Sequence, residues 1–249
     1  MKLNILFPVL NEHLRLERGI TRCAAYLRAL SSKKGSILYG ESYRLTIVDN
    51  GSDDDTEEIG RRLAEEYEEV DYIRIEERGV GIAFRTGVEK NTAEIVGYMD
   101  IDLSTDLRYL AKTLRIFDQR PCIDYVNASR FHRKSHTTGR KWYRRITSAG
   151  LLILLKTVFG MKATDAICGF TFIRRGKAEE LVKQCSDDKG WFYMIELLLR
   201  AERGGVRIAD LPVEWTEDYD TTVKIPKTVK NYLINIVKLK KTFIEERIC

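Results

Sequence analysis

The stretch EIVGYMDID, residues 94–102, gives the strongest indication of the fold. It is a short apolar run that ends in two carboxylates, Asp100 and Asp102. Strands covered by helices on both faces have continuous apolar sequences of this kind, whereas strands with one wet face alternate apolar and polar residues. The stretch therefore predicts a buried parallel strand with acidic residues at its carboxyl end.

Four further runs of the same kind occur in the first half of the chain: LNILFPV (3–9), YRLTIVDN (43–50), VDYIRIE (70–76) and DYVNAS (124–129). Helical patterns, such as residues 56–69 and 107–118, separate them. Strands that alternate with helices form βαβ units. The predicted fold class is therefore α/β, with a mostly parallel, Rossmann-like central sheet and helices on both faces. Ligands of such sheets bind at the carboxyl ends of the strands.

The second half is predicted to contain a helix with a basic start at 141–160, a helix at 191–203 and a strand at 207–215. An amphipathic basic helix is expected at 226–246, with apolar residues on one face and lysines around it. No repeat or Pro/Gly-rich linker divides the chain. We therefore expect a single domain over residues 1–249.

The charge and cysteine content exclude some classes of protein. The 42 basic and 37 acidic residues leave a net charge of only +5, spread along the chain, which argues against a nucleic-acid binder. The five cysteines show no paired spacing, which favours a reducing compartment. No signal peptide and no apolar run of about 20 residues is visible, so a cytoplasmic protein, soluble or peripheral on the membrane, is expected.

Asp100 and Asp102 are candidate metal ligands. Carboxylate oxygens suit Mg²⁺ or Mn²⁺, and such a metal can in turn hold a diphosphate. The alternative is that they belong to a helix-capping turn, which Ser104, Thr105 and Asp106 could also form. Taken alone, the Asp-x-Asp pattern does not decide between the two.

Polar residues at other strand ends support the metal interpretation. FPVLNE (7–12) and IVDNGSD (47–53) follow the first two strands, and Asp49 suits the donors of a nucleobase or a ribose. The glycine-rich segment RGVG (78–81) leads into a helix, where the backbone amide of Gly81 could receive a phosphate. Each segment alone could be an ordinary turn. Together they place acidic residues at three neighbouring strand ends.

Eight pieces of the sequence, in order from residue 3 to about 217, match a known family: FPVLNE, IVDNGSDDDT, RGVGIAFRTG, YMDIDLSTD, NASRF, TDAICGF, WFYMIELL and LPVEWTE. The chain resembles family 2 glycosyltransferases, and among them the dolichyl-phosphate and polyprenyl-phosphate sugar transferases. The resemblance implies a GT-A fold and a metal-dependent, inverting transfer of a hexose. The donor would be a UDP- or GDP-linked sugar, and the acceptor a lipid phosphate.

The resemblance also implies roles for particular residues. It places the nucleotide sugar at Pro8, Asn11, Glu12, Asp49, Asp53, Asp100 and Asp102, and a Mg²⁺ or Mn²⁺ ion at Asp100, Asp102 and Ser104. It places the acceptor phosphate at Arg130 and at Arg144 or Arg145. Asp165 stands where the family has an aspartate near the reacting sugar, so the implied catalytic residues are Asp102, Arg130 and Asp165.

The last three pieces look closest to the glucose-transferring branch of this family. The sequence departs from the resemblance at Asn50, where the family often has an aspartate, at Val80, where the glucose branch has a lysine, and at Met194, where the helix motif has an aspartate. Val80 is closer to the mannose branch, so the donor base and sugar stay open. Trp191, Tyr193 and Trp215 could stack on a sugar or lie in the core.

Three alternatives also stay open. A sugar or protein hydroxyl acceptor would need a general base, for which Asp165 or Glu196 are the candidates. A non-catalytic module that binds nucleotide sugars is another interpretation. The basic apolar segments at 141–159 and 226–246 could lie on a membrane surface, pack on the protein core or form a homo-oligomer contact.

Overall fold

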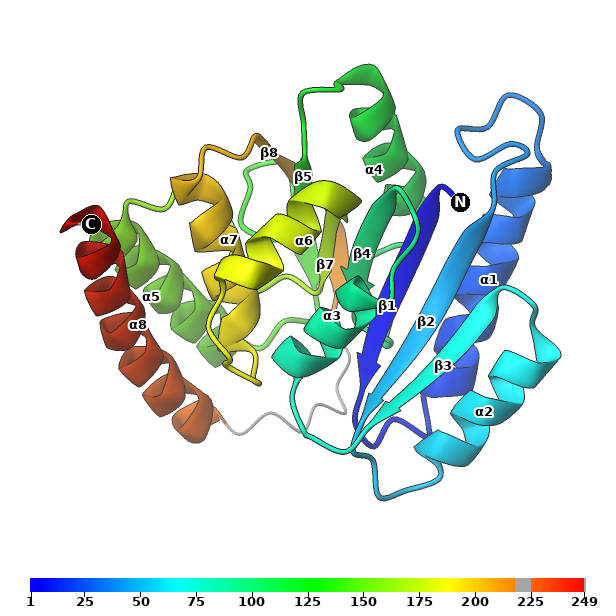
Figure 1. Ribbon diagram of the computed structural model, residues 1–249, viewed down its shortest axis with the longest axis horizontal. Coiled ribbons are helices and arrows are strands. Elements are labelled where there is room, and N and C mark those ends of the chain that lie inside the picture. Colours follow the sequence, from blue (N-terminus) through cyan, green and yellow to red (C-terminus); the bar gives the residue numbers. More distant parts are fainter. Residues whose placement is uncertain (218–224, 249) are drawn as a thin grey trace.

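The computed structural model describes residues 1–217 and 225–248 and has one seven-stranded sheet at its centre (Figure 1). The strand order is β3-β2-β1-β4-β7-β5-β8. The strands are β1 (Leu3–Val9), β2 (Tyr43–Asn50), β3 (Val70–Ile75), β4 (Ile95–Met99), β5 (Tyr125–Ser129), β7 (Phe170–Arg174) and β8 (Ile208–Pro212). All neighbouring pairs are parallel except those of β7, which runs antiparallel to β4 and β5. Cys249 lies outside the described residues.

Helices cover both faces of the sheet, because each face carries its own apolar cluster. One cluster joins the sheet to α1 (Leu16–Ser32), α2 (Thr56–Glu66) and α4 (Arg108–Gln119). The other joins it to α3 (Val80–Glu89), α6 (Arg175–Gln184) and α7 (Phe192–Arg203). The predicted α/β class with a mostly parallel sheet is therefore confirmed.

The strand β7 was not predicted. It comes late in the chain, yet it lies between β4 and β5, where β4 Met99 pairs with Phe170. Directly before it, the carbonyl of Gly169 accepts a hydrogen bond from the amide of Asp100 at 3.1 Å. This late segment therefore lies against the end of β4, where the two carboxylates begin.

The single strand predicted at 207–215 is wrong, because the chain forms two strands there. β8 belongs to the main sheet, and β9 (Glu214–Thr216) pairs in parallel with β6 (His136–Thr138) in a second, two-stranded sheet. The break falls at Pro212, which has no amide hydrogen to continue a ladder, and at Val213, whose side chain is buried in the core.

The two basic apolar segments form α5 (Trp142–Phe159) and α8 (Ile225–Ile248), which lie side by side outside α7 (Figure 1). α8 packs Ile236, Leu239 and Phe243 into the core. Only one residue of α5, Leu155, is fully buried. Both helices also keep large apolar side chains exposed: Trp142, Tyr143, Ile146, Ile153, Val229, Leu233, Ile234, Val237 and Ile244. Within the described residues, no helix has both the length and the apolar content needed to cross a membrane.

Candidate active site

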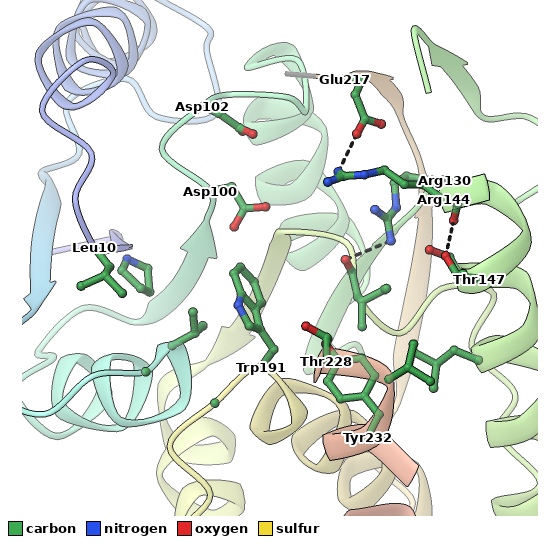
Figure 2. Close-up of a pocket in the computed structure, with 18 of the residues that line it drawn as sticks. Leu10, Asp100, Asp102, Arg130, Arg144, Thr147, Trp191, Glu217, Thr228 and Tyr232 are labelled. Carbon is green, nitrogen blue, oxygen red and sulfur yellow. Dashed lines mark hydrogen bonds and ion pairs between the residues drawn. The ribbon is translucent and has the colours of Figure 1, made fainter. Parts of the chain in front are cut away.

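A cavity of about 660 Å³ opens at the carboxyl edge of the sheet and extends to α5 and α8. Figure 2 shows Asp100 and Asp102 on one side of it and Arg130 and Arg144 on another, with Trp191 near Asp100. We call the part around the two carboxylates the carboxylate end, and the part lined by Arg130, Arg140 and Arg144 the arginine end. The fold thus brings residues from β4, β5, α5 and α8 to one pocket.

The carboxylate end is shaped by a tight turn after β4. Ile101 is buried in the core, so the chain turns and both flanking carboxylates face the pocket. Leu103 has a φ of 55°, a left-handed conformation that is costly for a leucine. The amide and hydroxyl of Ser104 both donate to the Asp102 carboxylate at 2.8 Å, which holds the turn in place. Such a turn allows residues two apart to face the same cavity.

The two carboxylates repel each other, and no ion pair within the described residues balances them. Burial and the charge of Asp102 raise the pKa of Asp100 to about 7, while the hydroxyl of Tyr98 donates to Asp100 at 2.6 Å. A divalent cation would remove this repulsion, so the residues fit Mg²⁺ or Mn²⁺. No group of three or more Asp, Glu, His or Cys side chains suited to a metal occurs in the described chain.

Gly169 is required by the position of Asp100. A Cβ atom at residue 169 would lie 1.7 Å from a carboxylate oxygen of Asp100. No side chain fits there unless the carboxylate moves. Gly169, in the sequence CGF, therefore leaves room for the carboxylate of Asp100.

The predicted nucleotide residues fall into two groups. Pro8 and Glu12 line the pocket. Asn11 and Asp53 bind each other across the ends of β1 and β2, with the Asn11 side-chain amide donating to Asp53 at 2.6 Å. Asp49 is fully buried and accepts hydrogen bonds from Tyr72, Arg74 and the Ser52 amide. Asn11, Asp49 and Asp53 therefore stabilise the edge of the sheet beside the cavity, and none of the three lines it.

The amide of Gly81 is already engaged in this structure. It donates to the carbonyl of Lys189 at 2.9 Å, and a Cβ atom at residue 79 would lie 1.9 Å from that same oxygen. The two glycines thus let the segment before α7 pack against the start of α3. Gly79 and Val80 line the pocket, whereas Gly81 is not among the lining residues.

At the arginine end, Arg130 and Asp165 form a buried ion pair. The Nε and Nη2 atoms of Arg130 donate to the two carboxylate oxygens at 2.8 and 3.0 Å, and its backbone amide donates as well. Burial opposes the charge of Asp165, but the positive charge of Arg130 holds the pKa of that carboxyl below its usual value. Arg130 lines the pocket and Asp165 lies behind it, 1% exposed.

The two arginines of the following helix have different surroundings. Arg144 lines the pocket and pairs with the buried Glu217 at 2.6 Å (Figure 2). Arg145 is exposed and is not among the lining residues. Of the two, only Arg144 is placed by the structure at the pocket.

A family model described as "Glycosyl transferase family 2" matches residues 4–182. The chain belongs to this family.

Relatives and a solved structure agree with that assignment. Dolichyl-phosphate beta-glucosyltransferase ALG5A of Trichomonas vaginalis is 28% identical over 92% of this chain and 70% of its own length. Glycosyltransferase AglD of Haloferax volcanii is 26% identical over 92% of this chain, which spans only 35% of that protein. Glucosyl-3-phosphoglycerate synthase of Mycobacterium tuberculosis, solved with Mn²⁺, UDP-glucose and phosphoglyceric acid, has a TM-score of 0.69 at 17% identity, covering 96% of this chain and 80% of its own. The predicted GT-A fold is confirmed.

Several pocket residues of this family 2 chain were not predicted as site residues from the sequence: Leu10, Arg15, Arg140, Glu217, Thr228 and Tyr232. Arg140 belongs to the run GRKWYRR, where no spacing distinguishes it from its basic neighbours. Of the three candidates for stacking, Trp191 and Trp215 line the pocket, whereas Tyr193 is fully buried in the core. The indole of Trp191 is 39% exposed and lies edge-on to Tyr98, with 6.5 Å between ring centroids.

Proposed function

We propose that this family 2 chain is an inverting glycosyltransferase that moves a hexose from a nucleotide diphosphate sugar to a polyprenyl-type lipid phosphate. One observation carries the proposal. A single cavity joins a carboxylate pair, which forms no ion pair among the described residues, to an arginine-bearing, apolar wall formed by α5 and α8. The dolichyl-phosphate glucosyltransferases among its relatives support the same acceptor class.

The carboxylate end is assigned to the donor. Asp100 and Asp102 would hold Mg²⁺ or Mn²⁺, with Ser104 fixing the orientation of Asp102. The metal would neutralise negative charge on the departing nucleoside diphosphate. Pro8, Glu12 and the β1 and β2 ends would position the nucleotide, and the exposed indole of Trp191 offers a flat face for the sugar.

In the proposed reaction, an oxygen of the acceptor phosphate attacks the anomeric carbon and forms the new C–O bond. The bond between that carbon and the β-phosphate oxygen breaks, and the nucleoside diphosphate leaves with the electron pair. A phosphate monoester has a second pKa near 6, so it is already anionic at neutral pH and needs no strong general base.

The positions of the two candidate general bases, Asp165 and Glu196, favour a phosphate acceptor over a hydroxyl acceptor. Of the two candidate bases, Asp165 is tied to Arg130, and Glu196 is held by Ser186 and Arg200. Neither lines the pocket. We therefore assign Asp165 to positioning Arg130, whose guanidinium faces the cavity.

The exposed apolar face of α5 and α8 is assigned to the membrane surface, where a lipid acceptor is met. Lys238 and Lys241 are exposed on α8 close to Val237 and Ile244. Exposed apolar side chains next to lysines suit the interface of an anionic bilayer. A homo-oligomer contact through the same face is the alternative, and liposome flotation distinguishes the two.

The function is tested with a panel of UDP- and GDP-sugars, Mn²⁺ and a short polyprenyl phosphate. Nucleotide release and the glycolipid product are both measured, and NMR of the product gives the anomeric configuration. The proposal predicts one preferred donor and a product of inverted configuration. Nucleotide release with a saccharide acceptor, and none with any phosphate, would contradict it.

A further inference from the structure

Three arginines line the arginine end, and two of them already have a buried carboxylate partner. Arg130 forms a bidentate ion pair with Asp165, which is 1% exposed. Arg144 pairs with Glu217, which is 5% exposed. Both therefore reach the pocket with their charge balanced by the chain itself.

Arg140 differs from both. Its guanidinium lies 5.1 Å from the ring centroid of Phe131 and 5.7 Å from that of Trp215. Within residues 1–217 and 225–248, its hydrogen bonds go to Ser148 Oγ at 2.7 Å and, at the limit of 3.5 Å, to the carbonyl of Arg144. No carboxylate in that part of the chain forms an ion pair with it.

The surroundings of Arg140 make a bound anion favourable. Burial, together with the nearby charge of Arg130, lowers the pKa of the Arg140 guanidinium to about 10, so it stays charged at neutral pH. A partly buried cation without a counter-ion is costly, and an anion in the pocket would offset that cost. Among the described residues, Asp165 and Glu217 act on this charge only from a distance, without an ion pair to Arg140, so a ligand anion in direct contact would add to its stabilisation.

The geometry indicates which kind of anion fits. A guanidinium held beside two aromatic rings keeps a fixed orientation, and its planar fork matches two oxygens of a phosphate. Leu151 and Leu154 of α5, and Tyr232 of α8, line the same pocket. An apolar group attached to the anion would therefore meet an apolar wall.

We propose that Arg140, together with the hydroxyl of Ser148, binds the phosphate monoester of the acceptor. This inference rests on the proposed function and refines it, since the family resemblance gave this role to Arg130 and to Arg144 or Arg145. Arg130 and Arg144 line the same pocket, each with a carboxylate partner, and Arg140 adds a third positive charge that the phosphate can contact. A lipid phosphate and a soluble phosphate monoester share this chemistry.

The kinetic test compares Arg140→Gln and Arg140→Lys with Arg133→Gln, an exposed arginine outside the pocket, as matched control. In the full chain with Mn²⁺, Arg140→Gln is expected to raise the KM for a short polyprenyl phosphate about 10- to 100-fold, because hydrogen bonds to charged groups are lost. The Kd for the nucleotide sugar stays within about twofold. Arg140→Lys keeps the positive charge but loses the planar guanidinium, so its KM for the acceptor should lie between those of the unchanged chain and Arg140→Gln. An unchanged acceptor KM, or an equal loss of donor affinity, overturns the inference.

A binding test without turnover separates this inference from the proposed function. Inorganic phosphate, glycerol phosphate and a short polyprenyl phosphate are each titrated into the chain with Mg²⁺ and nucleoside diphosphate, and ³¹P NMR reports binding. All three should bind, and Arg140→Gln should weaken each of them. Tighter binding of the polyprenyl phosphate identifies the lipid as the source, and equal binding of glycerol phosphate identifies a soluble monoester.

The outcomes are distinguishable. Phosphate binding that depends on Arg140, in a chain that transfers no sugar to any phosphate, overturns the proposed function alone. Transfer to polyprenyl phosphate with an intact acceptor KM in Arg140→Gln overturns the role of Arg140 alone. If thermal unfolding shows that Arg140→Gln does not fold, Arg140→Lys and Ser148→Ala decide by the same two measurements.

Discussion

The carboxylate end and the arginine end of the pocket differ in whether their charged side chains form ion pairs. Asp100 and Asp102 face the cavity side by side without a cationic partner in the described residues. At the arginine end, Asp165 and Glu217 each neutralise an arginine. The difference separates two kinds of residue. Charges left unbalanced by the chain are available for ligands, whereas balanced charges hold the wall together.

The largest expected effect comes from Asp102→Asn. The amide keeps an acceptor for Ser104 but loses the charge that a metal needs, so kcat/KM should fall about 1000-fold or more. Stability should stay the same or rise, because the repulsion with Asp100 is removed. Nucleotide release as a function of Mn²⁺, and the thermal unfolding midpoint, are measured beside the exposed control Asp118→Asn. Full turnover in excess chelator would remove the metal from the proposal.

A substitution that breaks the ion pair at the arginine end is expected to lower the free energy of unfolding. Arg130→Gln leaves Asp165 buried and unpaired, which typically costs about 3–5 kcal/mol of unfolding free energy. Denaturant unfolding measures this loss. The double variant Arg130→Met/Asp165→Leu should recover most of it, since no buried charge is left alone. A stable Arg130→Gln that loses only acceptor use would show that the ion pair is not structural.

The sequence predicts local features of the carboxylate end, but it does not predict long-range contacts of the arginine end. The strand ends and the Asp-x-Asp turn were predictable, because continuous apolar runs and polar strand ends are local patterns. The pairing of Arg130 with Asp165 was not, since 35 residues separate them and no spacing rule joins them. The place of β7 between β4 and β5 could not be predicted either, because the order of strands in a sheet is set by tertiary packing.

Gly169→Ala is expected to lower turnover about 100-fold. The added methyl group meets the Asp100 carboxylate, so the carboxylate must move, and misplacement by about 1 Å can cost this much. Gly176→Ala is the matched control, because a Cβ atom there meets nothing within 4 Å. Metal affinity, measured by Mn²⁺ titration, should fall with turnover. Equal activity of the two variants would show that Asp100 tolerates displacement.

The smallest expected effect concerns the membrane. Lys238→Gln/Lys241→Gln should weaken binding to anionic liposomes in flotation roughly 30-fold at low salt, since each of the two lysines near such a surface contributes about 1 kcal/mol. Lys240 is left in place because its ammonium donates to the carbonyl of Val158 at 2.7 Å. Lys33→Gln/Lys34→Gln, on the far side of the fold, is the control. If the unchanged chain does not float with the liposomes, the result favours a soluble acceptor over a lipid acceptor.

The late insertion of β7 has a consequence for the order in which the chain can fold during synthesis. Until residues 170–174 have been made, β4 lacks its second neighbour, and β5 cannot join the β1–β4 half of the sheet. The amide of Asp100 also lacks the Gly169 carbonyl until then. A nascent chain that pauses before residue 170 therefore exposes an open, strongly apolar strand edge, a template for aggregation. The carboxylate end gains these neighbours only after residues 169–174 have left the ribosome, and the contact between Ser104 and Thr216 forms later still.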